Sequence, residues 1–203
     1  MATLVGTLHG TLVHTRRVRI LADRLAAMVP PGARVLDVGC GDGALDRLIM
    51  ELRPDVNIEG IDVLVRPNPK IHVKHFDGTE IPYPDASFDA VMFVDVLHHT
   101  ANPAVLLREA KRVGRIVLIK DHCKEGFLAH PTLQIMDWVG NAHHGVSLPY
   151  NYWSRAQWTA AFKKLDLKVT AINERLGLYP APVSWVLERG LHFAARIDRA
   201  DAA

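Results

Sequence analysis

The fold is decided by one short stretch, RVLDVGCGDGA, which covers residues 34–44. Residues 34–38 form a short, dense run of apolar side chains ending at glycine, which is typical of a central parallel strand buried on both faces. Residues 42–52 then carry apolar side chains at helical spacing. Gly39, Gly41 and Ala44 match G-x-G-x-x-G/A, the fingerprint of dinucleotide-binding turns. This stretch therefore predicts a strand, a glycine turn and a helix.

The same alternation extends outward in both directions. Apolar residues at helical spacing predict a helix over 16–29, which Pro30, Pro31 and Gly32 end. Short apolar runs predict strands at 57–62, 88–94 and 115–119, with a weaker one at 71–76. Asn102 can cap a helix whose first turn holds Pro103. Strands that alternate with helices at this spacing favour a doubly wound parallel sheet.

The alternation stops after Lys120. Residues 121–153 show no clean period, and we expect a loop over 138–145. Ser154 can cap a further helix, and strand-like segments at 167–172 and 191–197 close the chain. The sequence holds no internal repeat or linker, so a single domain over 1–203 is expected.

The composition is that of an ordinary soluble domain, with 49% apolar and 23% charged residues and a formal net charge of +2 over 203 residues. This balance argues against a nucleic-acid acceptor, which would need a basic patch. The two cysteines, Cys40 and Cys123, give no disulfide framework and favour a reducing cytoplasm. There is no apolar run of about 20 residues to span a membrane and no signal peptide. We therefore expect a soluble, cytoplasmic protein.

Carboxylates near the glycine turn bear on which cofactor it binds. Asp37 precedes the turn, Asp42 lies inside it, and Asp62, Asp77 and Asp95 follow later strands. Open α/β sheets bind ligands at the carboxyl ends of their strands. Anions at this edge would repel a pyrophosphate, which helix N-termini otherwise bind. They suit a cationic cofactor that carries an ammonium group, and NAD fits less well.

The sequence here resembles the class I S-adenosylmethionine-dependent methyltransferases, particularly their small-molecule subgroup. Residues 35–43 are similar to the first motif of that family, and 60–62 to the acidic end of its second strand. Residues 77–83 and 87–91 resemble the adenine-side loop and fourth strand, and 94–99 the segment after that strand. The likeness covers residues 20–120. It implies a three-layer, Rossmann-like α/β sandwich with a mostly parallel seven-stranded sheet and an antiparallel last strand.

The resemblance also implies S-adenosylmethionine as cofactor and a binding site drawn from the strand ends. Its members are Asp37, Gly39, Cys40, Gly41, Asp62, Val63, Asp77, Gly78, Val94 and Asp95. Asp37 would help to hold the methionine amino group, Asp62 the ribose hydroxyls and Asp77 the adenine amino group. Simpler interpretations stay open, because Asp77 can start a turn and Asp37 can be a structural acid.

Two segments depart from the family pattern. Residues 112–115 are shorter than the usual Pro-Gly-Gly turn before the fifth strand. Asp166 stands where a glycine usually follows the last helix. Both departures concern loop geometry rather than the cofactor site.

The acceptor side carries histidines and aromatic residues. A neutral imidazole can accept a proton near pH 7, so His122, His99 and His143 are the candidate catalytic bases. Tyr150, Tyr152 and Trp153 could line an acceptor pocket, or could anchor their segment onto the last helix. No metal is expected, since adjacent histidines lack the compact spacing of zinc sites.

The expected function is methyl transfer from S-adenosylmethionine to a small-molecule oxygen, nitrogen or carbon nucleophile. Within the single domain, we expect an N-terminal helical cap (1–30), a cofactor-binding core (31–120), an acceptor-side insert (121–153) and a C-terminal helix with strands (154–203). Two alternatives are an NAD-dependent oxidoreductase and a non-catalytic methyltransferase-like partner subunit. The sequence leaves the oligomeric state and the identity of the acceptor open.

Overall fold

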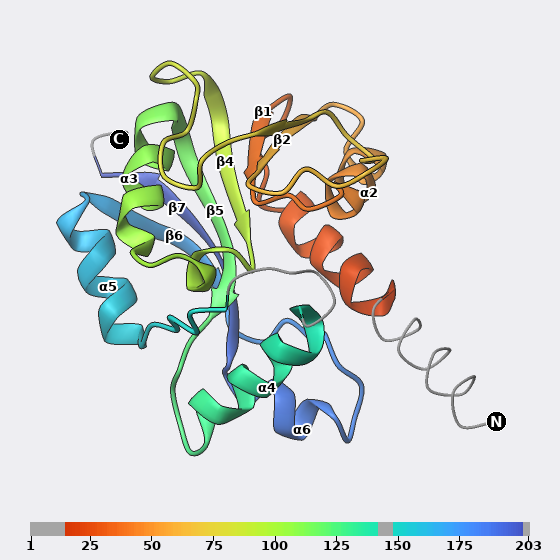
Figure 1. Cartoon of the computed structure of the whole chain (residues 1–203), viewed down its shortest axis with the longest axis vertical. Coiled ribbons are helices and arrows are strands. Elements are labelled where there is room, and N and C mark those ends of the chain that lie inside the picture. The colour runs from red at the N-terminus through yellow and green to blue at the C-terminus, as the bar shows by residue number, and fades with distance from the viewer. Residues whose placement is uncertain (1–14, 142–147, 201–203) are drawn as a thin grey trace.

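The computed structural model describes residues 15–141 and 148–200. Its centre is a seven-stranded sheet with strand order β3-β2-β1-β4-β5-β7-β6 (Figure 1). Strand β7 runs antiparallel to both of its neighbours, and the other strand pairs are parallel. The strands are β1 (Arg34–Val38), β2 (Asn57–Asp62), β3 (Val73–His75), β4 (Phe88–Val94), β5 (Gly114–His122), β6 (Leu167–Asn173) and β7 (His192–Arg199). The predicted sheet and its antiparallel last strand are confirmed.

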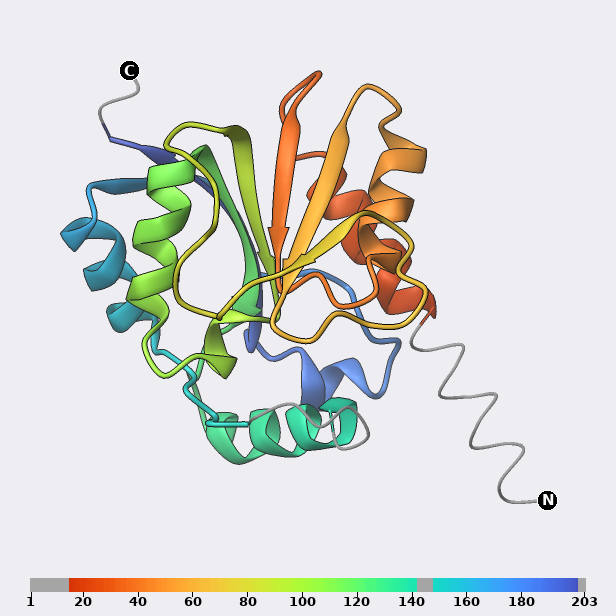
Figure 2. The same cartoon turned by 45° about the horizontal axis from the view of Figure 1, so that its top comes forward.

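Helices cover both faces of the sheet (Figure 2). A helix over residues 15–26 and α2 lie on one face, and α3 and α5 lie on the other. The remaining helices are the 3-10 turn η1, α4 and α6. Their bounds are α2 (Ala44–Leu52), η1 (Leu97–His99), α3 (Pro103–Val113), α4 (Ala129–Asn141), α5 (Arg155–Lys164) and α6 (Ser184–Leu187). Among these described helices, none has the length and apolar character that crossing a membrane requires.

Strand β4 shows how the sequence builds the layers. Because successive side chains of a strand point to opposite faces, its apolar residues divide between two cores. Val91 and Phe93 pack with α3 and α5, whereas Ala90 and Met92 pack with α2 and the helix over 15–26. Every one of these four side chains is buried. The result is the three-layer, Rossmann-like sandwich.

The predicted helix caps are present. The Asn102 side chain accepts a hydrogen bond from the Ala104 backbone N–H, and Pro103 occupies the first turn of α3. Ser154 and Gln157 form a reciprocal capping box at the start of α5. Both caps fix where a helix begins and therefore how it meets the sheet.

Helix α4 corrects the prediction for the segment after Lys120. The expected loop over 138–145 was wrong as far as residue 141, because the helix continues to that point. Residues 142–145 lie outside the described part of the chain. The helix gives no amphipathic pattern, since Leu133 is buried while Ile135, Trp138 and Val139 are exposed. Apolar side chains on both its faces therefore hid its period.

The two departures from the family pattern have local explanations. Helix α3 runs directly into β5, so no longer turn is needed before Gly114. A Cβ atom on Gly114 would lie 2.6 Å from Val91 Cγ2, so the close approach requires glycine. Asp166 takes a positive φ of 51° after α5, the left-handed conformation that glycine commonly supplies at helix ends.

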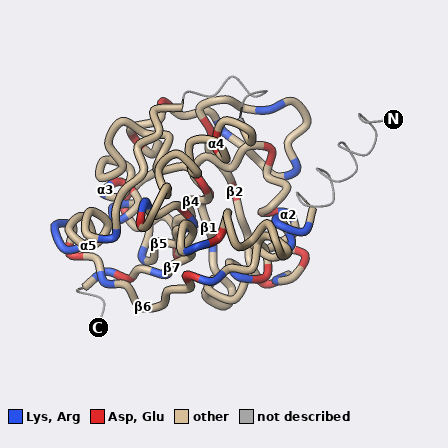
Figure 3. The backbone as a smooth tube through the Cα atoms, turned by 90° about the horizontal axis from the view of Figure 1, so that it is seen from below, with Lys and Arg blue, Asp and Glu red and all other residues tan. Residues whose placement is uncertain are grey.

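The parallel strands end at one edge of the sheet, and α4 and α6 lie across it (Figure 2). This is the edge at which open α/β sheets bind their ligands. Basic and acidic positions are interspersed along the described chain, as Figure 3 shows from below. We therefore expect the ligand site at this edge, between the sheet and α4.

Candidate active site

A cavity of about 730 Å³ opens at this edge of the sheet. Its size falls within the usual range for small-molecule sites, about 300–1,000 Å³. Its walls come from the glycine turn, the ends of β2 and β4, η1 and α4. From these elements, together with the loop after β3 and the end of β5, come Gly39, Gly41, Asp62, Val63, Gly78, Val94, Asp95, His98, His99, His122, Met136 and Asp137. One cavity thus joins most of the predicted cofactor residues to the histidines.

The glycine turn and Asp62 form one end of the cavity. Gly39 and Gly41 have positive φ angles of 80° and 61°. The Gly41 N–H donates to Asp62 Oδ2 at 2.8 Å, and the Leu64 N–H donates to Asp62 Oδ1 at 2.8 Å. These bonds hold the carboxylate at the end of β2. A Cβ on Gly41 would meet no atom within 4 Å, so the backbone here faces open space.

An apolar slot lies beside Asp62. Val63 is 53% exposed although it is apolar, and it lines the cavity together with Phe76 and Gly78. Gly78 has a φ of 85°, and a Cβ there would lie 3.2 Å from Val63 Cγ1. A flat ring could pack in this slot.

Asp77 lies next to this slot but is not among the lining residues. Its Oδ1 accepts hydrogen bonds from the backbone N–H groups of Thr79, at 2.7 Å, and Glu80, at 2.9 Å. The bond from Glu80 is the main reason that the pKa of Asp77 is lowered. Asp77 therefore forms the turn that the sequence allowed, through one of its two oxygens.

Asp37 and Asp46 form a buried pair under the glycine turn. Their residues are 3% and 0% exposed, and neither lines the cavity. Burial, followed by the neighbouring Asp46 carboxyl, raises the pKa of Asp37 well above its usual range. Burial also raises the pKa of Asp46 to about 7. The pair therefore keeps a proton near neutral pH, and carries less negative charge than the sequence suggests.

Asp95 lies in the middle of the cavity between two cations. Lys120 Nζ contacts its Oδ1, and Arg17 Nη2 lies 2.6 Å from its Oδ2. Burial opposes the ionisation of Asp95, but Lys120 and Arg17 together hold its pKa well below the usual range. Lys120 is wholly buried, whereas the Asp95 side chain is 21% exposed. The negative charge of Asp95 is thus compensated, unlike that of Asp62.

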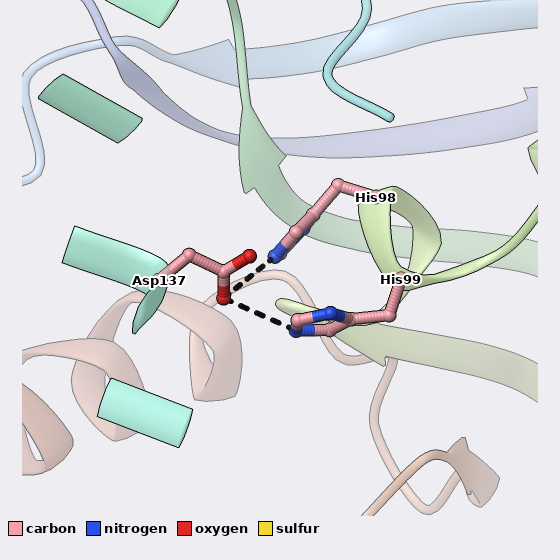
Figure 4. A group of neighbouring side chains, drawn as sticks. All are labelled: His98, His99 and Asp137. Atoms are coloured by element: carbon pink, nitrogen blue, oxygen red, sulfur yellow. Dashed lines mark ion pairs between the residues drawn. The ribbon is translucent and has the colours of Figure 1, made fainter. Parts of the chain in front are cut away.

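Three histidines and Asp137 line the far end of the cavity, and the buried Asp121 contacts His98. His98 Nδ1 lies 2.7 Å from Asp121 Oδ1, and the Leu97 N–H donates to Asp121 Oδ2 at 3.0 Å. His98 Nε2 and His99 Nε2 both face Asp137 Oδ1, at 3.7 Å and 3.4 Å (Figure 4). His122 Nδ1 lies 3.4 Å from His98 Nδ1.

The three histidines differ in protonation. Burial lowers the pKa of His122 to about 4, and burial together with His98 also lowers the pKa of His99. Burial opposes the charge on His98 too, but Asp121 outweighs it and raises the pKa of His98 to about 10. At pH 7, His122 and His99 are therefore neutral. Both line the cavity, so either imidazole could accept a proton from a bound molecule.

The predicted aromatic residues lie outside the cavity lining. Tyr152 is buried, and its hydroxyl donates to Asp137 Oδ2 at 2.9 Å. Trp153 packs edge-on against Trp158 of α5, and Tyr150 lies 6.4 Å from Tyr152 between ring centroids. These contacts agree with the anchoring interpretation of the segment. His143 lies outside the described residues.

Several residues of the site were missed by the sequence analysis. They are Arg17, Asp46, Lys120, Asp121 and Asp137. Lys120 and Asp121 come at the end of a dense apolar strand, the position from which side chains reach a ligand, and Asp46 lies one helical turn before the buried Ile49. No pattern pointed to Arg17 or Asp137.

The chain matches the family described as "Methyltransferase domain" over residues 12–172. It belongs to that family. This methyltransferase-family protein is 37% identical to 27-O-demethylrifamycin SV methyltransferase of Amycolatopsis mediterranei over 117 residues. The match covers 48% of this chain and 43% of the relative. It is 34% identical over 119 residues to phosphoethanolamine N-methyltransferase 3 of Arabidopsis thaliana, 52% of this chain and 24% of the relative. The chain thus spans less than half the length of these curated relatives.

Solved structures agree on the fold. A methyltransferase from Thermotoga maritima, described as S-adenosylmethionine-dependent and a possible histamine N-methyltransferase, superposes with a TM-score of 0.65 at 17% identity. The match covers 97% of this chain and 96% of that one. The family implies S-adenosylmethionine as cofactor. The open space beside Gly41, the fixed carboxylate of Asp62 and the apolar slot at Val63 fit such a cofactor.

Proposed function

We propose that this methyltransferase-family chain transfers a methyl group from S-adenosylmethionine to a small-molecule acceptor. The observation that carries the proposal is the single cavity, which has Asp62 and the glycine turn at one end and the histidines at the other. A volume of about 730 Å³ lies within the usual range for sites that bind small molecules, about 300–1,000 Å³. The named O- and N-methyltransferase relatives support the same class of substrate.

Asp62, Val63 and the glycine turn would bind the cofactor. Asp62 accepts one bond on each oxygen and can accept more, because a carboxylate oxygen has two lone pairs. It would therefore hold the ribose hydroxyls. Val63 and Gly78 would contact the adenine, and Asp77 would use Oδ2 for the adenine amino group. Asp37 does not line the cavity, so it would act on the methionine end only through the glycine turn that follows it.

The histidine end would receive the acceptor. The cofactor supplies an electrophilic methyl group, and the protein must align the acceptor nucleophile with it. His99 and His122 are the proposed proton acceptors, because both are neutral at pH 7 and both line the cavity. Val94 and Asp95 would border the position of the transferred methyl group. Whether the nucleophile is oxygen, nitrogen or carbon depends on the acceptor.

The proposed division of the domain follows the cavity. Arg17 reaches it from the N-terminal cap, and Met136 and Asp137 reach it from the acceptor-side insert over 121–153. The interspersed charges seen in Figure 3 support a small-molecule acceptor rather than a nucleic acid. The free thiols of Cys40 and Cys123 fit a reducing compartment such as the cytoplasm.

Calorimetric titration tests the cofactor assignment. We expect S-adenosylmethionine and S-adenosylhomocysteine to bind the purified protein and NAD not to bind. The Asp62→Asn substitution should weaken both by about 10- to 100-fold, since a hydrogen bond to a charged group contributes about 1.5–3 kcal/mol. Asp89→Asn, at the opposite edge of the sheet, is the matched control and should bind as the wild type does. Binding of NAD alone would overturn the proposal, and binding of no nucleoside would favour a non-catalytic role.

A further inference from the structure

Three side chains converge on one point of the cavity wall. His98 and His99 come from η1, and Asp137 comes from α4 (Figure 4). Asp137 Oδ1 lies 3.7 Å from His98 Nε2 and 3.4 Å from His99 Nε2. The three potential ligand atoms all lie within 4.8 Å of one another. All three residues line the cavity.

We propose that His98, His99 and Asp137 bind a divalent transition-metal ion of the zinc type. Zinc bonds to histidine nitrogen and carboxylate oxygen are about 2.0–2.2 Å long. Two such ligands at a tetrahedral angle are separated by roughly 3.3–3.5 Å. The measured separations of 3.4 Å and 3.7 Å lie at or just beyond this value. Charge-assisted hydrogen bonds are shorter, about 2.7–2.9 Å. The two separations therefore fit ligands around an ion better than direct hydrogen bonds.

Buried partners already orient two of the three ligands. His98 Nδ1 is 2.7 Å from Asp121 Oδ1, which directs His98 Nε2 toward Asp137. Metal-bound histidines commonly make this contact with a carboxylate through their second nitrogen. The Tyr152 hydroxyl donates to Asp137 Oδ2 at 2.9 Å and leaves Oδ1 facing the histidines. The site is therefore held in shape by Asp121 and Tyr152.

A second group, His98, Asp121 and His122, is also compact but fits an ion less well. The distance of 2.7 Å between His98 Nδ1 and Asp121 Oδ1 is that of a direct hydrogen bond, which leaves no space for a bound ion. A metal at His98 Nε2 and this hydrogen bond at Nδ1 are compatible. The geometry therefore points to Asp137 rather than to His122 as the third ligand.

The donor set selects the class of ion. Two imidazoles and one carboxylate suit Zn²⁺, Co²⁺ or Fe²⁺, whereas Mg²⁺ and Ca²⁺ prefer oxygen ligands alone. Three protein ligands leave a fourth position, and here it faces the cavity, as in catalytic zinc sites. An acceptor oxygen would bind there, and His122 rather than the metal-bound His99 would then accept the proton of the acceptor. That last role rests on the proposed function, whereas the metal site itself does not.

Metal titration of the chelator-treated full-length chain tests the site directly. We expect one equivalent of Zn²⁺ by calorimetry, visible absorption bands when Co²⁺ replaces it, and no binding of Mg²⁺. The His99→Gln and Asp137→Asn substitutions should each weaken Zn²⁺ binding at least tenfold. His72→Gln, at an exposed position before β3, is the matched control and should leave the affinity unchanged. A second control replaces His143 and His144, which lie outside the described residues, and should also leave the Zn²⁺ affinity unchanged.

The outcomes separate the metal from the cofactor. Zn²⁺ binding that is absent, or unchanged in both His99→Gln and Asp137→Asn, overturns the metal site. We expect both variants to bind S-adenosylhomocysteine as tightly as the wild type, because His99 and Asp137 do not lie at the Asp62 end of the cavity. Circular dichroism shows whether each variant is folded. If a variant is not folded, the Co²⁺ spectrum of the wild-type protein decides. Co²⁺ that binds without the visible bands expected for a four-coordinate ion with nitrogen and oxygen ligands would also overturn the site.

Discussion

The two ends of the cavity are built in different ways. At the cofactor end, Gly41 lies in the turn after β1 and Asp62 ends the adjacent strand β2, and a hydrogen bond from the Gly41 N–H to the Asp62 side chain joins them. At the acceptor end, His98 lies in η1, Asp121 in β5 and Asp137 in α4. Only the tertiary fold brings β5 and α4 close to η1. The cofactor end is thus a local structure built from neighbouring turns and strands. The acceptor end depends on what the chain adds after β4.

Two carboxylate positions, Asp95 between the two ends and the Asp37 and Asp46 pair under the glycine turn, also differ in their electrostatic partners. Asp95 is compensated by the cations of Lys120 and Arg17, whereas Asp37 and Asp46 are buried with only each other. A buried charge is stable when it is paired and costly when it is not. Removing a carboxylate should therefore have opposite effects on stability at the two places.

The largest effect is expected at Asp95. Asp95→Ala leaves Lys120 wholly buried without its main counter-charge, which should cost about 3–5 kcal/mol of unfolding free energy. Denaturant unfolding at pH 7 measures this cost. Asp85→Ala is the matched control, because it removes the exposed partner of Arg112. A change at Asp95 no larger than that at Asp85 would show that Lys120 finds another partner or loses its proton.

At Asp46 we expect the opposite sign. Burial raises the pKa of Asp46 to about 7 in the folded state, so the folded protein binds this proton more tightly than the unfolded chain. The stability contributed by the proton is present below pH 4 and is lost as pH rises toward 7 and above. Asp46→Asn removes that loss and should stabilise the protein at pH 8 by about 1–2 kcal/mol, with a smaller gain at pH 5.

Thermal unfolding of the cofactor-free protein at both pH values measures the difference. Asp23→Asn, at an exposed position of the helix over 15–26, is the control and should show no gain that depends on pH. A destabilised Asp46→Asn variant at pH 8 would mean that Asp46 is ionised and paired in the folded protein. The contrast drawn between Asp46 and Asp95 would then fail.

The cofactor end could be predicted from sequence because its signals are local. The glycine turn, the strand before it and Asp62 after the next strand all lie within residues 34–62, and the spacing of the residues sets their geometry. The charge of this end could not be predicted. Asp37 was interpreted as one of the anions at this edge, but it is buried beside Asp46, and burial raises the pKa of both carboxyls.

The acceptor end escaped prediction for a different reason. Asp137 lies on α4, a helix with apolar side chains on both faces, so the sequence gave no period to place it. Arg17 meets Asp95 across 78 residues, and no spacing rule encodes such a contact. Tyr152 and Trp153 were recognised as a group, but burial decides whether an aromatic residue lines a pocket or anchors a segment. Burial depends on the complete fold.

Tyr152 gives the smallest expected effect and the most direct test of that choice. Tyr152→Phe removes the donor to Asp137 Oδ2 and should cost about 1 kcal/mol of stability, with weaker Zn²⁺ binding because Asp137 is no longer held. Tyr150→Phe is the control and should change neither quantity. If Tyr152 instead lined the acceptor pocket, its hydroxyl would contact the acceptor. The substitution would then raise the KM for the acceptor and leave both the unfolding free energy and the Zn²⁺ affinity as they were.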